Sequence, residues 1–303
     1  MTIEAKRALY IKLGEGGDWA ERCIKRDQTV QMGFNEVDHS LCAQRRWEEV
    51  REQAKAVYGG KMATRVTNQL RHFYDDEEDI LWITFHQGAL WWCFSRPDVA
   101  LLDGGYRARP VIDQWKDSDV QGQTLTLERL SGKLTMMQGF QGTLCSVKES
   151  DYLLRKINAV DEPDVQNAKS AQQALVDRIE AVIHNLHWRD FEVLVDLLFR
   201  QAGWRRISEL GGTQKTLDLI LDSPITGERY GVQVKSQADA ALLNSYETQV
   251  ADMQGFTRFY LAVHSPSAGL DQNAGKVEVL GPAKVAEWSV KYGLVDWIID
   301  RAG

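Results

Sequence analysis

Two short strand-like segments joined by a strong turn sequence constrain this chain more than any other feature. The segments are TLDLILD at 216–222 and RYGVQVKS at 229–236, and the sequence SPITG lies between them. Because Pro and Gly in such a short connection favour a turn, the two segments are predicted to pair as neighbouring strands.

The pairing would gather polar side chains on one face. Successive side chains of a strand point to opposite faces, so Gln233 and Lys235 share one face while Val232 and Val234 share the other. On the first strand, Leu217, Leu219 and Leu221 are expected on one face, with Asp218 on the other. Asp218 is then expected beside Gln233 and Lys235. The alternative reading makes Gln233 and Lys235 plain solvated strand residues, but a carboxylate without a partner among leucines would be costly.

These three side chains suit phosphodiester chemistry. The Asp218 carboxylate and the Gln233 carbonyl are hard oxygen ligands, which favour magnesium over zinc. A bound ion would activate water and neutralise charge on a phosphate. Lys235 could position or deprotonate that water, or stabilise the phosphate. Glu192, near the start of a predicted helix at 190–204, is the natural further carboxylate; the alternative is an ordinary acidic residue favoured by the helix dipole.

The segments FEVLVDLLFRQAGW, LDLIL and VQVK together resemble the catalytic domain of Mrr-type restriction endonucleases, across residues 180–265. These belong to the PD-(D/E)xK nuclease superfamily, in the branch where Gln replaces the second acidic residue. The resemblance implies that Glu192, Asp218, Gln233 and Lys235 are catalytic and that the first three hold Mg²⁺, with Mn²⁺ as an alternative ion. It departs from the family at 211–216, GGTQKT, which offers no second acid and leaves the number of ions open.

The remaining pattern of the second half predicts a mixed α/β sheet of the restriction-endonuclease type. Helices are expected at 170–186, 190–204, 239–253 and 282–291, and further strands at 206–209, 258–265 and 276–281. Residues 159–169 are polar, contain Pro163 and lack periodicity, so they are predicted to link a first domain at 1–158 to a second at 170–303.

The first half has the composition of a β-rich, barrel-like domain with helices. The clearest signal is a hairpin of 80–86 and 89–95 around Gln87-Gly88. Other strands are predicted at 8–14, 124–130, 133–140 and 142–147, and helices at 43–58 and 62–74.

Tryptophans in this half are candidate walls of a base-binding pocket. Trp19 lies in a glycine-rich stretch beside Asp18, and Trp91 and Trp92 are adjacent on a strand, so they face opposite sides. Aromatic walls with a polar group suit a base flipped out of a duplex. The size and strand-rich pattern are loosely similar to PUA-like modules (the EVE, YTH and SRA group), several of which read modified bases. The alternative is that these tryptophans fill the core of a barrel.

Charge and cysteine usage restrict the class further. The formal net charge is −7, and the four cysteines have no zinc-ligand spacing. An acidic chain is untypical of a nonspecific nucleic-acid binder, although bound metal would supply positive charge. Arg107 and Arg109 are candidates for phosphate contacts or solvated charges. No apolar run is long enough to cross a bilayer, and we expect a soluble, cytoplasmic protein without membrane contact.

Together these features predict a modification-dependent, type IV-like DNA endonuclease acting in defence against phage or foreign DNA. Its expected partner is modified double-stranded DNA, on which it would form a homodimer or a higher assembly. One alternative is a repair or junction nuclease with the same site. Another is a DNA-binding regulator with an inactive nuclease fold.

Overall fold

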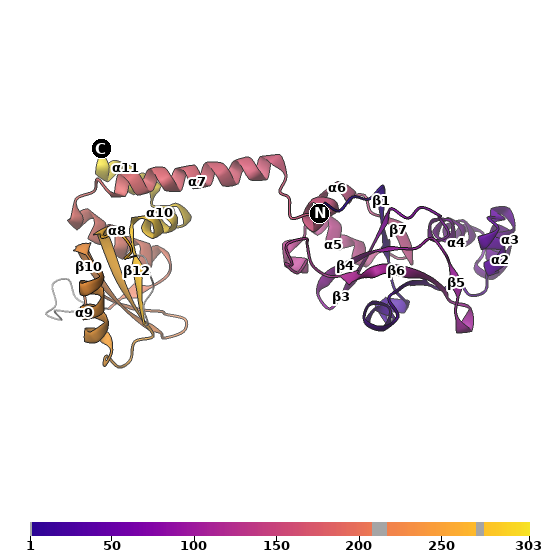
Figure 1. The fold of residues 1–303 in the computed structure, drawn as a ribbon, viewed down its shortest axis with the longest axis horizontal. Coiled ribbons are helices and arrows are strands. Elements are labelled where there is room, and N and C mark those ends of the chain that lie inside the picture. The colour runs from indigo at the N-terminus through magenta and orange to yellow at the C-terminus, as the bar shows by residue number, and fades with distance from the viewer. Residues whose placement is uncertain (1, 208–216, 271–275) are drawn as a thin grey trace. The chain divides into compact units, whose positions relative to one another are not determined.

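The chain divides into two compact units, Met1–Glu162 and Pro163–Gly303 (Figure 1). The computed structural model describes residues 2–207, 217–270 and 276–303. Helix α7 (Pro163–Ile183) begins at Pro163, because proline suits the first turn of a helix. The segment predicted as a linker, 159–169, is therefore helical from Pro163 onward. Within the described ranges, no helix is both long and apolar enough to cross a membrane.

A curled half-barrel sheet forms the framework of the first unit, as predicted for its fold class. The strand order is β2-β6-β4-β3-β1-β7, and the short β5 pairs with β6. Its strands are β1 (Arg7–Ile11), β2 (Thr29–Met32), β3 (Ile80–His86), β4 (Ala89–Ser95), β5 (Ala100–Leu101), β6 (Arg107–Lys116) and β7 (Leu144–Ser146). Its helices are α1 (Ala20–Arg22), α2 (His39–Ala43), α3 (Trp47–Tyr58), α4 (Gly60–Phe73), α5 (Gly132–Thr135) and α6 (Ser150–Ile157).

The predicted hairpin of β3 and β4 is present with the predicted bounds. Its two turn residues, Gln87 and Gly88, have φ angles of 49° and 77°. Two positive φ values are the signature of the turn that matches the twist of paired strands. The strand predicted at 133–140 is wrong, because α5 and a 3₁₀ turn (Met136–Gly139) occupy it. The hydroxyl of Ser131 caps this helical start at the Leu134 N–H, 3.4 Å away.

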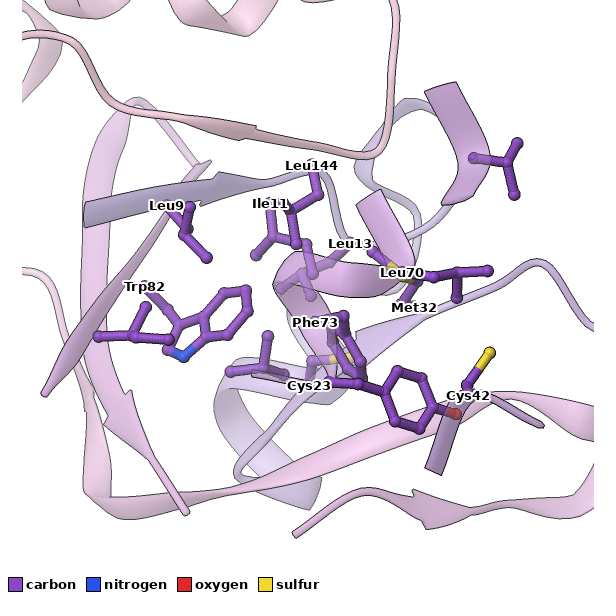
Figure 2. Packing of buried hydrophobic residues seen from close by; sticks show 14 of the residues in the cluster. Leu9, Ile11, Leu13, Cys23, Met32, Cys42, Leu70, Phe73, Trp82 and Leu144 are labelled. Carbon is purple, nitrogen blue, oxygen red and sulfur yellow. The ribbon is translucent and has the colours of Figure 1, made fainter. Parts of the chain in front are cut away.

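Both faces of this sheet are packed. Side-chain alternation sends Leu9 and Ile11 of β1 into one core, where they meet Phe73 and Trp82 (Figure 2). The neighbouring Tyr10 points into the other core, against α5 and α6. A sheet with two packed faces explains why its central strands are apolar almost throughout.

Two arginines of β6 are buried, so the prediction of phosphate-contacting or solvated charges at these positions is wrong. Arg107 and Arg109 are 1% and 0% exposed. Each guanidinium donates to backbone carbonyls: Arg107 to residues 33, 34 and 37, and Arg109 to residues 73, 75, 77 and 96. Burial lowers the pKa of Arg109 to about 10, which still leaves it charged at neutral pH. Both arginines therefore fasten loops to the sheet.

The second unit is a mixed five-stranded sheet between helices, which confirms the predicted fold class. Its order is β12-β11-β10-β9-β8, and β10, β11 and β12 run parallel while β8 and β9 are antiparallel to their neighbours. The strands are β8 (Arg205–Arg206), β9 (Leu219–Asp222), β10 (Arg229–Ala238), β11 (Arg258–Pro266) and β12 (Val277–Leu280). The predicted strand end at 208–209 and the GGTQKT segment at 211–216 lie outside the described residues.

Helices cover the two faces of this sheet unequally (Figure 1). One core joins the sheet to α7, α8 (Trp188–Gln201), α10 (Pro282–Lys291) and α11 (Val295–Ala302), the last of which the sequence reasoning did not predict. The other core joins it to α9 (Ala240–Val250). The two faces are named the α8 face and the α9 face below.

Gly231 of β10 packs closely against Phe259 of β11 on the α9 face. A Cβ at this position would lie 2.7 Å from the Phe259 ring and 3.0 Å from Leu217. Gly231→Ala is therefore expected to destabilise the second unit by about 1–3 kcal/mol through overpacking. Urea unfolding measures the change, with Ser236→Ala on the exposed part of the same strand as the matched control. Equal stability of the two variants would contradict this packing.

Candidate active site

Strand register places Asp218 beside β10, the strand that carries Gln233 and Lys235. In β9 and β10, Leu219 pairs with Val232, so Asp218 comes opposite Gln233. The Asp218 N–H donates to the Val232 carbonyl at 2.9 Å, and the Val234 N–H donates to Asp218 Oδ2 at 2.7 Å. The carboxylate is thus fastened to the backbone between Gln233 and Lys235.

The polar set lies on the α9 face. Gln233 and Lys235 are in register with Leu261 and Val263 of β11, which pack in the core beneath α9. Gln233 is only 7% exposed, and Lys235 is half-buried. Burial first, and then the nearby Asp218 charge, raise the pKa of Tyr246 on α9. The site is therefore shielded by α9 and electrostatically coupled to it.

Leu217 departs from the predicted alternation. It packs in the α9 core rather than beside Leu219 and Leu221, which belong to the α8 core. The regular strand begins only at Leu219, and Asp218 lies in a bend. This bend allows the Asp218 carboxylate to reach back to the Val234 N–H.

Glu192 lies on α8, the helix that covers the opposite face. The start of α8 lies at the end of the sheet where Lys235 is found: the Phe191 ring is 5.3 Å from that of His264, one residue beyond the partner of Lys235. Among residues 2–207, 217–270 and 276–303, no three His, Cys, Asp or Glu side chains gather closely enough to hold a metal ion. The structure thus places Glu192 at the end of the sheet where Lys235 lies, without joining it to Asp218 in one cluster.

Sequence reasoning missed a connection between α8 and the Asp218 backbone. Arg206 on β8, 13% exposed at its side chain, donates from Nη2 to the Asp218 carbonyl at 3.4 Å. Its Nη1 lies 3.7 Å from Asp196 Oδ1 on α8, and Asp196 also pairs with Arg200 at 2.7 Å. The only sequence signal was the i, i+4 spacing of Asp196 and Arg200, which by itself indicates an ordinary helix pair.

The donors present fit a hard divalent cation. Asp218 Oδ2 accepts one backbone hydrogen bond, and a carboxylate has further lone pairs with which to bind an ion. The amide of Gln233, the residue opposite, adds a neutral oxygen. Oxygen donors of this kind suit Mg²⁺ or Mn²⁺ and are poor zinc ligands.

In the first unit, Trp19 lines a cavity of about 600 Å³. Phe34 and Tyr58 form another part of its wall, with ring centroids 6.0 Å apart, and the hydroxyl of Tyr58 donates to Glu36. Arg65 also lines this cavity. The Trp19 cavity therefore combines aromatic surfaces with charged and polar groups.

Asp18 and Trp19 both lie against Gly14, whose φ is +83°. A Cβ there would lie 1.9 Å from Asp18 Oδ1 and 2.6 Å from the Trp19 ring, so only glycine fits. Asp18 itself is exposed beside the cavity. The position of the Trp19 ring in the cavity wall therefore depends on glycine at position 14.

The structure places Trp91 and Trp92 in the two cores of the first unit. They are 7% and 3% exposed and lie on opposite faces of β4, as the strand period requires. Their indole N–H groups donate to the carbonyls of His86 and Ser118 at 3.2 and 2.9 Å. Both are packed and hydrogen-bonded as core residues, which leaves Trp19 as the cavity-lining tryptophan of the three.

Comparison with known protein families finds a match over this part of the chain. Residues 183–265 match the family model Mrr_cat, described as a restriction endonuclease. The second unit contains an Mrr-type restriction endonuclease domain. The matched segment runs from the end of α7 to β11, so it includes Glu192, Asp218, Gln233 and Lys235. The resemblance stated from the sequence is thereby confirmed for the nuclease domain.

Two solved structures are similar to most of the chain at 12% sequence identity. One is the DNA modification-dependent restriction endonuclease AspBHI, with a TM-score of 0.29, covering 97% of this chain and 85% of that one. The other is the MspJI restriction endonuclease in complex with a 27-mer oligonucleotide, with a TM-score of 0.25, covering 80% and 70%. Both TM-scores are too low to establish a shared global fold, so the assignment rests on the family model. No curated protein matches the chain.

Proposed function

We propose that the chain is a divalent-metal-dependent endonuclease that cuts modified double-stranded DNA, a type IV-like restriction activity directed at phage or other foreign DNA. One observation carries the nuclease part. Within the segment that matches a restriction endonuclease model, Asp218 is hydrogen-bonded to the strand that bears Gln233 and Lys235.

In this proposal Asp218 and Gln233 hold Mg²⁺ or Mn²⁺, and Glu192 joins them from α8. The ion, when bound, would supply Lewis-acid stabilisation of the phosphate and a more acidic water. Asp218 needs no rearrangement to serve, because the Val234 N–H already orients its carboxylate. Burial of Gln233 keeps its carbonyl in a region of low dielectric, where interaction with a cation is stronger.

Lys235 acts on the substrate side of the same face. Its ammonium group, two residues beyond Gln233, would donate to a nonbridging phosphate oxygen as negative charge develops. The ammonium group would also orient the attacking water, whereas the neutral amine form of Lys235 would accept the proton of that water. Its half-buried position limits competition from solvent for both tasks.

The first unit is the proposed reader of the modified base. The cavity lined by Trp19, Phe34 and Tyr58 offers ring faces for stacking, and Glu36 and Arg65 offer groups that hydrogen-bond to base edges. Enzymes and readers that act on a base outside the stack need this combination.

A double-strand cut generally needs two active sites, one for each DNA strand, and each chain carries only one proposed site. We therefore propose that the protein works as a homodimer or a larger assembly on DNA. Analytical ultracentrifugation with and without a modified duplex measures this directly.

The test of the proposed function compares matched plasmids with and without modified bases, in Mg²⁺, in Mn²⁺ and in EDTA. The proposal expects metal-dependent double-strand cuts on modified DNA only. Efficient cutting of unmodified branched DNA would instead favour a repair or junction nuclease. DNA binding without any cutting in either metal would favour a regulator with an inactive nuclease fold.

Trp19→Ala is expected to remove most of the preference for modified DNA. Stacking of one base on an aromatic ring contributes about 1–3 kcal/mol, so affinity for the modified duplex should fall roughly 5- to 150-fold. Trp19→Phe keeps a ring and should retain most of the preference. Fluorescence anisotropy with modified and unmodified duplexes measures both variants. Unchanged discrimination in Trp19→Ala would rule out this cavity as the reader.

A further inference from the structure

Helix α4 carries a polar stripe with two cations, Lys61 and Arg65, in a chain of net negative charge. The protein has 43 Asp and Glu against 36 Lys and Arg, yet α4, GKMATRVTNQLRHF, has no acidic residue. Ala63, Val66, Leu70 and Phe73 of this helix are buried. The opposite side presents Lys61, Thr64, Arg65, Asn68 and His72 at helical spacing.

This stripe borders a hollow that continues from the Trp19 cavity. A groove of about 440 Å³ shares Arg65 and Gln69 with that cavity and runs between α4 and residues 140–146. A further groove of about 490 Å³ shares Phe140, Cys145 and Ser146 with the 440 Å³ groove. Lys133 and Lys148 border this further groove. The three hollows adjoin one another through shared lining residues, and together we name them the α4 track.

The cations of the α4 track are available for a ligand. Lys61, Lys133 and Lys148 are exposed, and across residues 2–207 none of them forms an ion pair with a carboxylate. Other cations of the unit are paired, such as Lys6 with Glu77 and Arg45 with Asp76. Arg65 packs its guanidinium 5.1 Å from the Phe140 ring centroid, which fixes its place in the track.

We propose that the α4 track binds the phosphodiester backbone of the DNA strand whose base enters the Trp19 cavity. This inference rests on the proposed reading function and names the surface that would position the strand. Backbone affinity comes from Lys and Arg at phosphates, with hydroxyl and amide groups adding hydrogen bonds. The track supplies both kinds, the second from Thr64, Asn68 and Ser146.

Because phosphate contacts carry no sequence information, the track should contribute equally to modified and unmodified duplexes. The cavity should contribute only to the modified one. The two surfaces are thus separable by experiment.

The test replaces Lys61, Lys133 and Lys148 together with Ala in the full chain and measures duplex binding over a range of salt concentrations. Each lost phosphate contact lowers the slope of log K against log salt by about 0.9, so the slope should fall by about 2.7, with affinity falling roughly 10- to 100-fold on both duplexes. The matched control replaces Lys6, Lys25 and Lys55, three exposed lysines of the same unit outside the track, for an equal change in net charge. The control should change the slope by less than about 0.5.

Equal effects of the two triple variants would overturn the track, because they would reflect net charge alone. Competition by polyglutamate as effective as by duplex would also overturn it and identify a protein-binding surface. If the unaltered chain binds neither duplex, the proposed function itself fails, an outcome distinct from both.

Discussion

Asp218→Asn is expected to reduce the rate of DNA cleavage by about 10³-fold or more while leaving the fold intact. A bound ion contributes several kcal/mol of transition-state stabilisation, and about 4 kcal/mol corresponds to roughly 10³ in rate. The Asn side-chain oxygen can still accept the hydrogen bond that the Val234 N–H donates. Single-turnover cleavage, with thermal unfolding and duplex binding measured in parallel, separates lost chemistry from lost structure.

The matched control is Asp222→Asn on the same strand. Asp222 pairs with the exposed Arg205 at 2.8 Å and lies at the other end of β9 from Asp218. Exposed ion pairs contribute little to stability, so this variant should fold normally and cleave at nearly the normal rate. Lys235→Ala should resemble Asp218→Asn. Cleavage by Asp218→Asn within tenfold of the unaltered protein would exclude Asp218 as a metal ligand.

Arg107→Ala is expected to destabilise the first unit by at least about 3 kcal/mol. Its guanidinium donates to the carbonyls of Gly33 and Phe34 at 3.0 and 2.9 Å, to that of Val37, and to the Tyr74 hydroxyl at 2.9 Å. Truncation would leave these buried acceptors unpaired, at about 1–3 kcal/mol each. Urea unfolding of the full chain, followed by tryptophan fluorescence, measures the change.

Two further variants sharpen this prediction. Arg51→Ala removes an exposed arginine from α3 and should change stability by no more than about 0.5 kcal/mol. Arg107→Lys keeps the charge but lacks the planar fork that reaches several carbonyls, so its stability should lie between the two. Since Gly33 and Phe34 line the Trp19 cavity, Arg107→Lys should also weaken binding of modified DNA. If Arg107→Ala is as stable as Arg51→Ala, the hydrogen bonds of the buried Arg107 guanidinium do not stabilise the first unit.

The parts of the fold that could be predicted from the sequence are those in which local chemistry sets the register. Gln87-Gly88 fixed the β3–β4 hairpin, because two positive φ values are easy only for such residues. The SPITG turn did the same for β9 and β10, and a strand period of two then placed Asp218 opposite Gln233. Any slip by one residue would have sent these side chains to opposite faces.

The features that sequence reasoning missed depend on contacts distant in the chain. The sequence predicts Arg107 as a phosphate-contacting or solvated charge, and only the fold brings residues 33–37 over it. The α4 track joins a helix to a segment about 70 residues further on, and no local pattern indicates that meeting. Residues 133–140 show the limit of short apolar runs, since periodicity alone cannot separate a strand from a helical turn.

The most direct test of the central claim is anomalous diffraction from crystals of the full chain soaked in Mn²⁺. The account predicts an anomalous peak bound by an Asp218 carboxylate oxygen and the Gln233 side-chain carbonyl, with Lys235 beside it and Glu192 as the additional ligand from α8. Crystals of cleavage-competent protein that show Mn²⁺ bound elsewhere, with Asp218 and Gln233 making no contact to it, would contradict the account.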